Sequence, residues 1–129
     1  MVTRESLLTW VEKESNIYFG GEKPIYSILL FEYPDKQYMY EDGKESGFPD
    51  LGANNEIGYY HSLEHAIDAM NVNNLDMREE TYNAGFILCR FPGLYNSVGH
   101  LARMYFVWND DEGGFFQAEE PEIFEHMVY

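Results

Sequence analysis

The chain has 129 residues, of which 23 are Asp or Glu and only 8 are Lys or Arg, so its formal net charge at pH 7 is −15. Such a charge repels phosphate backbones and anionic lipid surfaces, which excludes direct binding to nucleic acids or membranes through a basic patch. Disorder is not expected, because 45% of the residues are hydrophobic and 17% are aromatic. The composition predicts one folded domain over residues 1–129.

The N-terminus lacks the sustained apolar region of a signal peptide. The longest nearly apolar run, residues 25–31, is far shorter than the roughly 20 residues of a membrane-spanning helix. We therefore expect a cytoplasmic protein. Cys89 is the single cysteine and ends the apolar run Phe86-Ile87-Leu88, so it is expected to be a buried structural thiol.

The first elements expected along the chain are a helix and a strand. Residues 3–14 place four apolar side chains on one side of a helix: Leu7, Leu8, Trp10 and Val11. Residues 25–32 are rich in β-formers and predict a central strand. A turn at 33–36 then leads into residues 37–41, which predicts a hairpin, and the Gly- and Asn-rich segment 42–56 predicts a loop.

The second half opens with the clearest helix. Ser62 has the chemistry of an N-cap, and apolar residues follow it at positions 63, 66, 67 and 70. Residues 75–82 are expected to form a short second helical turn. Strands are predicted at 84–91, 104–109 and 115–118, the last two joined by the acidic turn 110–114. The fold class is thus α+β, with an antiparallel sheet of about four or five strands and two main helices.

Both faces of the strands at 84–91 and 104–109 are apolar, whereas a one-sided sheet would alternate with polar residues. Two helices are too few to cover both faces of such a sheet completely. A homodimer that buries the remainder is therefore one hypothesis.

Several short runs between Gly58 and Tyr95 are distinctive: Gly-Tyr-Tyr-His-Ser-Leu-Glu-His-Ala-Ile-Asp-Ala-Met at 58–70, Asp-Met-Arg-Glu-Glu at 76–80, and Pro-Gly-Leu-Tyr at 92–95. The closing pattern comprises Phe106, Trp108, Gly113-Gly114 and Glu119-Glu120-Pro121-Glu122. These runs, in the C-terminal two-thirds of the chain, resemble uncharacterised small acidic proteins carried on phages and mobile elements of Gram-positive bacteria. The resemblance supplies no activity or catalytic residues, but it implies a role in counter-defence or host interaction.

The strongest enzymatic motif is the run from His61 to His65, which matches the H-x-x-E-H pattern of inverted zinc peptidases, with Glu64 as the water-activating residue. If Ser62 caps the helix, however, His61 lies outside it and the two histidines cannot share one helical face. A third ligand would have to come from acids such as Glu119, Glu120 or Glu122. A zinc hydrolase is therefore only a remote alternative, and neither a metal nor another cofactor is expected.

The acidic turn 109–114 does not fit a calcium loop, because neither of its glycines stands in register with ligands at positions 1, 3 and 5. Carboxylate pairs for acid-base catalysis cannot be singled out among 23 acids. We accordingly expect a protein that is not an enzyme.

The acids are densest at the end of the chain, since residues 110–129 hold seven Asp or Glu and no Lys or Arg. One hypothesis is an inhibitor that presents carboxylates to the basic DNA channel of a CRISPR effector or restriction enzyme, by DNA mimicry or by occlusion. The predicted partner-binding residues are Asp110, Asp111, Glu112, Glu119, Glu120, Glu122 and Glu125, with Asp76, Glu79 and Glu80 as additions. The alternative is an interaction or accessory module whose acids only solvate its surface.

Overall fold

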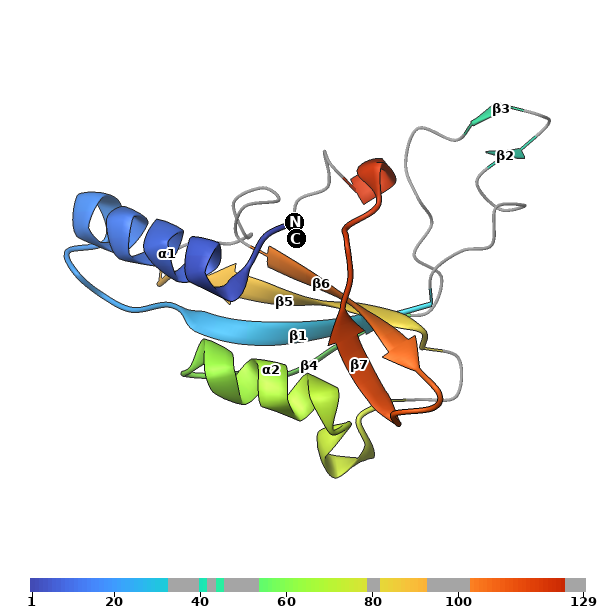
Figure 1. Ribbon diagram of the computed structural model, residues 1–129. Helices are drawn as coiled ribbons and strands as arrows, with labels where there is room; N and C mark the ends of the chain where they lie inside the picture. Colours follow the sequence, from blue (N-terminus) through green and yellow to red (C-terminus); the bar gives the residue numbers. More distant parts are fainter. Residues whose placement is uncertain (33–39, 42–43, 46–53, 79–81, 93–102, 125–129) are drawn as a thin grey trace.

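A computed structural model describes residues 1–32, 40–41, 44–45, 54–78, 82–92 and 103–124. Two α-helices, α1 (Arg4–Tyr18) and α2 (Leu63–Asn71), accompany an antiparallel sheet (Figure 1). The sheet has five strands in the order β4-β1-β5-β6-β7. Their bounds are β1 Ile25–Phe31, β4 Asn54–Tyr60, β5 Ala84–Arg90, β6 Arg103–Asn109 and β7 Gly114–Gln117. The predicted α+β class is confirmed.

Helix α1 begins with a capping box. The Ser6 amide donates to Thr3 Oγ1 at 3.1 Å, and the Thr3 amide donates to Ser6 Oγ at 2.9 Å. The helix runs to Tyr18, past the predicted end near Glu14. Its end is set by Gly20 and Gly21, whose φ angles of +60° and +83° are left-handed.

The predicted hairpin after β1 is wrong. Strand β1 pairs with β4 on one side and β5 on the other, which leaves no edge for residues 37–41. The described part of that segment, β2 (Tyr40–Glu41), instead pairs with β3 (Lys44–Glu45) in a separate two-stranded ladder. Residues 37–39 lie outside the described part of the chain.

Strand β4 was not predicted, and its first residues fall at the end of the expected loop 42–56. Asn54 and Asn55 have low β propensity, and Gly58 interrupts the alternation. The register with β1 slips between Ser27 and Ile28, so Gly58 (φ +55°) is the extra residue of a β-bulge. A bulged edge strand lacks the alternating apolar pattern by which strands are detected in sequence.

Both helices pack into the core cluster on one face of the sheet. Leu7 and Val11 of α1 and Leu63, Ala66 and Met70 of α2 belong to this cluster. The sheet contributes the buried side chains of Ile28, Leu30, Ile87, Cys89 and Phe106. Burial raises the pKa of the Cys89 thiol to about 12, as expected for a structural cysteine.

The second face carries its own aromatic cluster. Phe31, Phe86, Leu88 and Tyr105 surround Phe124, which belongs to the short 3₁₀ helix η4 (Glu122–Phe124). Phe86 and Leu88 are fully buried within the single chain. The uncovered face that motivated a homodimer is therefore not observed, and the homodimer stays a prediction without that argument.

In the described residues, no helix is both long enough and apolar enough to span a membrane.

Candidate interaction surface

The β6–β7 turn displays three exposed acids: Asp110, Asp111 and Glu112. The Asn109 side-chain oxygen shapes this turn by accepting the amides of Asp111 at 3.0 Å and Glu112 at 3.1 Å. The Asp110 carboxylate is anchored separately, because it accepts the Trp108 indole N–H at 2.6 Å. The turn thus holds its acids on an ordered backbone.

A second segment approaches the same end of the molecule, the 3₁₀ helix η2 (Asn74–Asp76) that follows α2 (Figure 1). The Arg78 guanidinium lies over the Trp108 ring, 4.3 Å from its centroid. A Cβ atom on Gly114 would lie only 1.9 Å from the Asn71 carbonyl oxygen, so the end of α2 touches the start of β7. The exposed Asp76 therefore lies at the same end of the sheet as the β6–β7 turn.

This end also carries exposed apolar side chains in a strained backbone. Leu75 has φ +56° and is 92% exposed, and Val72 is 68% exposed. A bulky residue at positive φ is uncommon, because its Cβ crowds the carbonyl oxygen. Hydrogen bonds around Asn73 hold the segment, since its Oδ1 accepts the Arg78 amide at 3.0 Å and its Nδ2 donates to Asp76 Oδ1 at 3.3 Å.

We call this surface the acidic tip and define it as Val72, Leu75, Asp76, Asp110, Asp111 and Glu112. Its two apolar members were missed in the sequence, because isolated apolar residues outside a periodic pattern do not reveal their exposure. Strain held in place by surrounding structure is frequent at functional sites.

The other predicted acids are elsewhere. Glu119, Glu120 and Glu122 follow the far end of β7, whose four residues span about 13 Å. Glu120 is not free to face a partner, because its carboxylate pairs with the buried Arg103 at 2.6 Å. Glu79, Glu80 and Glu125 lie outside the described residues. The predicted partner-binding acids that the structure describes thus form two groups rather than one continuous set.

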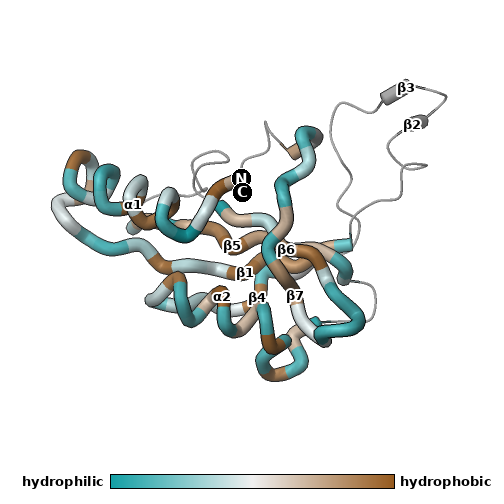
Figure 2. Tube along the Cα trace, viewed as in Figure 1, coloured by the Kyte–Doolittle hydropathy of each residue, from teal (hydrophilic) through white to brown (hydrophobic). Residues whose placement is uncertain are grey.

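All four arginines of the chain are engaged within it. Arg4 pairs with Glu64, Arg90 pairs with Glu56 at 3.0 Å, and Arg103 pairs with Glu120. Arg78 stacks on Trp108 and donates to the Tyr82 carbonyl at 2.7 Å. Figure 2 colours the β6–β7 turn as strongly hydrophilic, and the sequence shows that this turn carries three acids. The acidic tip contains no lysine.

The H-x-x-E-H segment does not have the geometry of a zinc site. Ser62 is the N-cap of α2 and its Oγ accepts the His65 amide at 3.5 Å, so His61 precedes the helix, as the sequence predicts. Glu64 is held by Arg4. Across the described ranges, no three His, Cys, Asp or Glu side chains form a group that could hold a metal ion.

Comparison with known proteins gives no relative: no family model, no curated protein and no solved structure matches this chain. The resemblance to acidic proteins of phages and mobile elements therefore stays a prediction.

Proposed function

We propose that this protein is a non-enzymatic inhibitor that binds a basic surface of a nucleic-acid-binding host-defence protein through the acidic tip. One observation carries the proposal: the tip combines four exposed carboxylates with a strained leucine that is 92% exposed. Carboxylates steer the protein toward a basic partner, and an exposed apolar side chain beside them supplies an anchor that is desolvated on binding.

The arrangement favours occlusion of a basic surface over imitation of a long duplex. Duplex DNA carries one charge per about 1.7 Å of axis, so a mimic needs a long, regular row of acids. Here the acids of the tip and those around η4 lie at opposite ends of β7, and Glu120 is neutralised by Arg103. A localised acidic patch with exposed apolar side chains suits the rim or floor of a basic channel, such as that of a CRISPR effector or restriction enzyme.

The test compares two pairs of charge reversals at the two ends of β7. Asp111→Lys with Glu112→Lys changes the tip and leaves the Asp110 bond to Trp108 intact. Glu119→Lys with Glu122→Lys is the matched control, because both residues are exposed and the net charge becomes −11 in each variant. In a DNA-cleavage assay with a CRISPR effector or a restriction enzyme, we expect the tip variant to inhibit at least tenfold more weakly than the natural chain. The control variant should lose less than twofold of the inhibition.

A third variant separates the apolar anchor from the charge. Leu75→Asn removes an exposed side chain and places there a residue that tolerates positive φ, so the free energy of unfolding should rise by about 1 kcal/mol. Its inhibition should nevertheless weaken. Equal loss in both charge variants would show that only overall charge matters, and no inhibition by the natural chain would favour the accessory module.

A further inference from the structure

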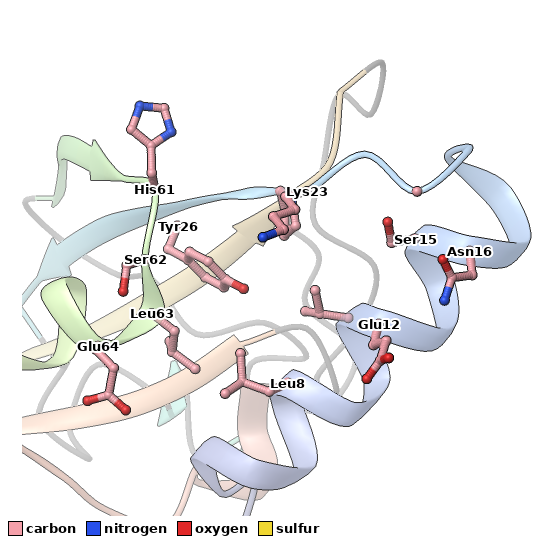
Figure 3. Close-up of a pocket in the computed structure, with 13 residues that line it drawn as sticks. Leu8, Glu12, Ser15, Asn16, Lys23, Tyr26, His61, Ser62, Leu63 and Glu64 are labelled. Carbon is pink, nitrogen blue, oxygen red and sulfur yellow. The ribbon is translucent and has the colours of Figure 1, made fainter.

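A cavity of about 480 Å³ lies between α1 and the start of α2, on the helix-covered side of the sheet (Figure 3). Its volume falls within the range of small-molecule sites. Leu8, Val11 and Leu63 supply apolar walls, and Leu8 remains 41% exposed although it faces this space. The acidic tip has no residue in the lining of this cavity.

Tyr26 contributes a buried hydroxyl to the cavity. Its side chain is only 4% exposed and its hydroxyl points into the space between α1 and α2 (Figure 3). Within the described chain the hydroxyl has no hydrogen-bond partner, and a buried hydroxyl left unpaired costs free energy. Burial, with a smaller effect of the neighbouring Cys89, raises the pKa of Tyr26 to about 12, so the hydroxyl is a hydrogen-bond donor at neutral pH.

Further donors converge on the same space. The Lys23 ammonium turns toward the Tyr26 hydroxyl (Figure 3), and the described residues include no ion-pair partner for it. Helix α2 begins at the cavity with the amides of Leu63 and Glu64, which have no protein acceptor in the described structure. Such first-turn amides favour an anion.

The two acids of the lining leave this donor group accessible. Glu64 is held by Arg4. The Glu12 carboxylate points away from the Tyr26 hydroxyl along α1 (Figure 3). Ser15 is also satisfied, because its hydroxyl donates to the Glu22 carbonyl. The lining of the cavity therefore combines apolar side chains with hydrogen-bond donors.

We propose that this cavity binds a small carboxylic acid with a hydrocarbon body, whose carboxylate accepts hydrogen bonds from Tyr26, Lys23 and the first turn of α2. The hydrocarbon body packs against Leu8, Val11 and Leu63. This binding is separate from the proposed inhibition, because the two surfaces share no residue.

The experiment titrates sodium octanoate into the full chain by isothermal calorimetry, with octan-1-ol and octylamine as probes of equal length. We expect saturable binding of one octanoate per chain and at least tenfold weaker binding of the alcohol and the amine. Tyr26→Phe should weaken octanoate binding about tenfold, as expected for loss of a hydrogen bond to a charged group. Lys23→Gln should weaken it about fivefold.

Matched controls come from the same region. Tyr18→Phe and Lys13→Gln change exposed residues of α1 outside the lining and should alter octanoate affinity less than twofold. Tyr26→Phe should leave the melting temperature of the free protein unchanged or raise it, because the ring remains and the cost of an unpaired buried hydroxyl is removed. Absence of saturable octanoate binding, equal affinity for all three probes, or unchanged affinity in Tyr26→Phe would overturn the proposal. The same pocket variants should inhibit DNA cleavage as strongly as the natural chain does.

Discussion

Arg103 illustrates how one residue in this acidic chain acquires a structural role. Its side chain on β6 is fully buried, lies over the Phe86 ring at 5.0 Å and donates to Glu120 at 2.6 and 3.3 Å. It also donates to the Phe124 carbonyl. The guanidinium thus fastens the segment after β7 to the second face of the sheet.

Removing one partner of this ion pair should destabilise the fold. Glu120→Ala removes the Glu120 carboxylate from the buried Arg103 charge, so we expect the free energy of unfolding to fall by about 3 kcal/mol. Urea denaturation followed by circular dichroism measures the change. The control Glu119→Ala alters an exposed neighbour and should change the free energy of unfolding by no more than about 0.5 kcal/mol. A loss below 1 kcal/mol for Glu120→Ala would show that the Glu120 carboxylate contributes little to the stability of the fold.

At the residue scale, the sequence is informative where a role depends on near neighbours. The burial of Cys89 and the cap at Ser62 were predicted, because an apolar run and a following helical pattern are local properties. The role of Glu120 was not, since it depends on a partner 17 residues away that only sheet pairing brings close.

Among the elements, β7 and α2 approach each other closely through their backbones, because Gly114 at the start of β7 meets the Asn71 carbonyl of α2. A methyl group at this position would lie 1.9 Å from the oxygen, a distance that requires α2 and β7 to separate. The same contact places the end of α2 against the β6–β7 turn, on which the acidic tip depends.

Substitution of the two adjacent glycines should have different effects. Gly114→Ala should lower the free energy of unfolding by about 3 kcal/mol or more, because the backbone must move. In Gly113→Ala the added methyl group has no atom within 4 Å, but the alanine must adopt φ +70°. This substitution should therefore lower the free energy of unfolding by about 1 kcal/mol. Thermal denaturation of both variants gives the comparison, and equal costs would contradict the close approach of α2 and β7.

The elements themselves were predictable when their patterns were strong. The strands β1, β5 and β6 and the helix α2 have apolar runs or a helical period that survive in the sequence. Strand β4 has neither, and its bulge at Gly58 shifts the alternation. The predicted hairpin failed because turn chemistry at 33–36 says nothing about which strand occupies the edge of β1.

On the scale of the whole molecule, the charge of −15 opposes compaction. The intramolecular pairs of Arg4, Arg90 and Arg103 reduce this repulsion locally but use the chain's arginines. The remaining surface is dominated by carboxylates, which repel one another over about a Debye length.

Salt should therefore stabilise the protein. Between 10 and 200 mM NaCl, roughly the range over which the Debye length falls from about 30 Å to below 10 Å, we expect the free energy of unfolding in urea to rise on the order of 1 kcal/mol. The Glu119→Lys and Glu122→Lys variant, with a net charge of −11, should gain less free energy of unfolding from the added salt. A decrease with salt would show that the arginine ion pairs outweigh the repulsion.

The sequence by itself determined the charge, the α+β class and the location of most strands and helices, because composition and local periodicity encode them. Tertiary structure decided which acids lie together. Packing of α2 against β7 brings Asp76 and Leu75 to the same end as the β6–β7 turn, whereas Arg103 removes Glu120 from the exposed set. Those contacts join residues far apart in the chain, and no local pattern records them.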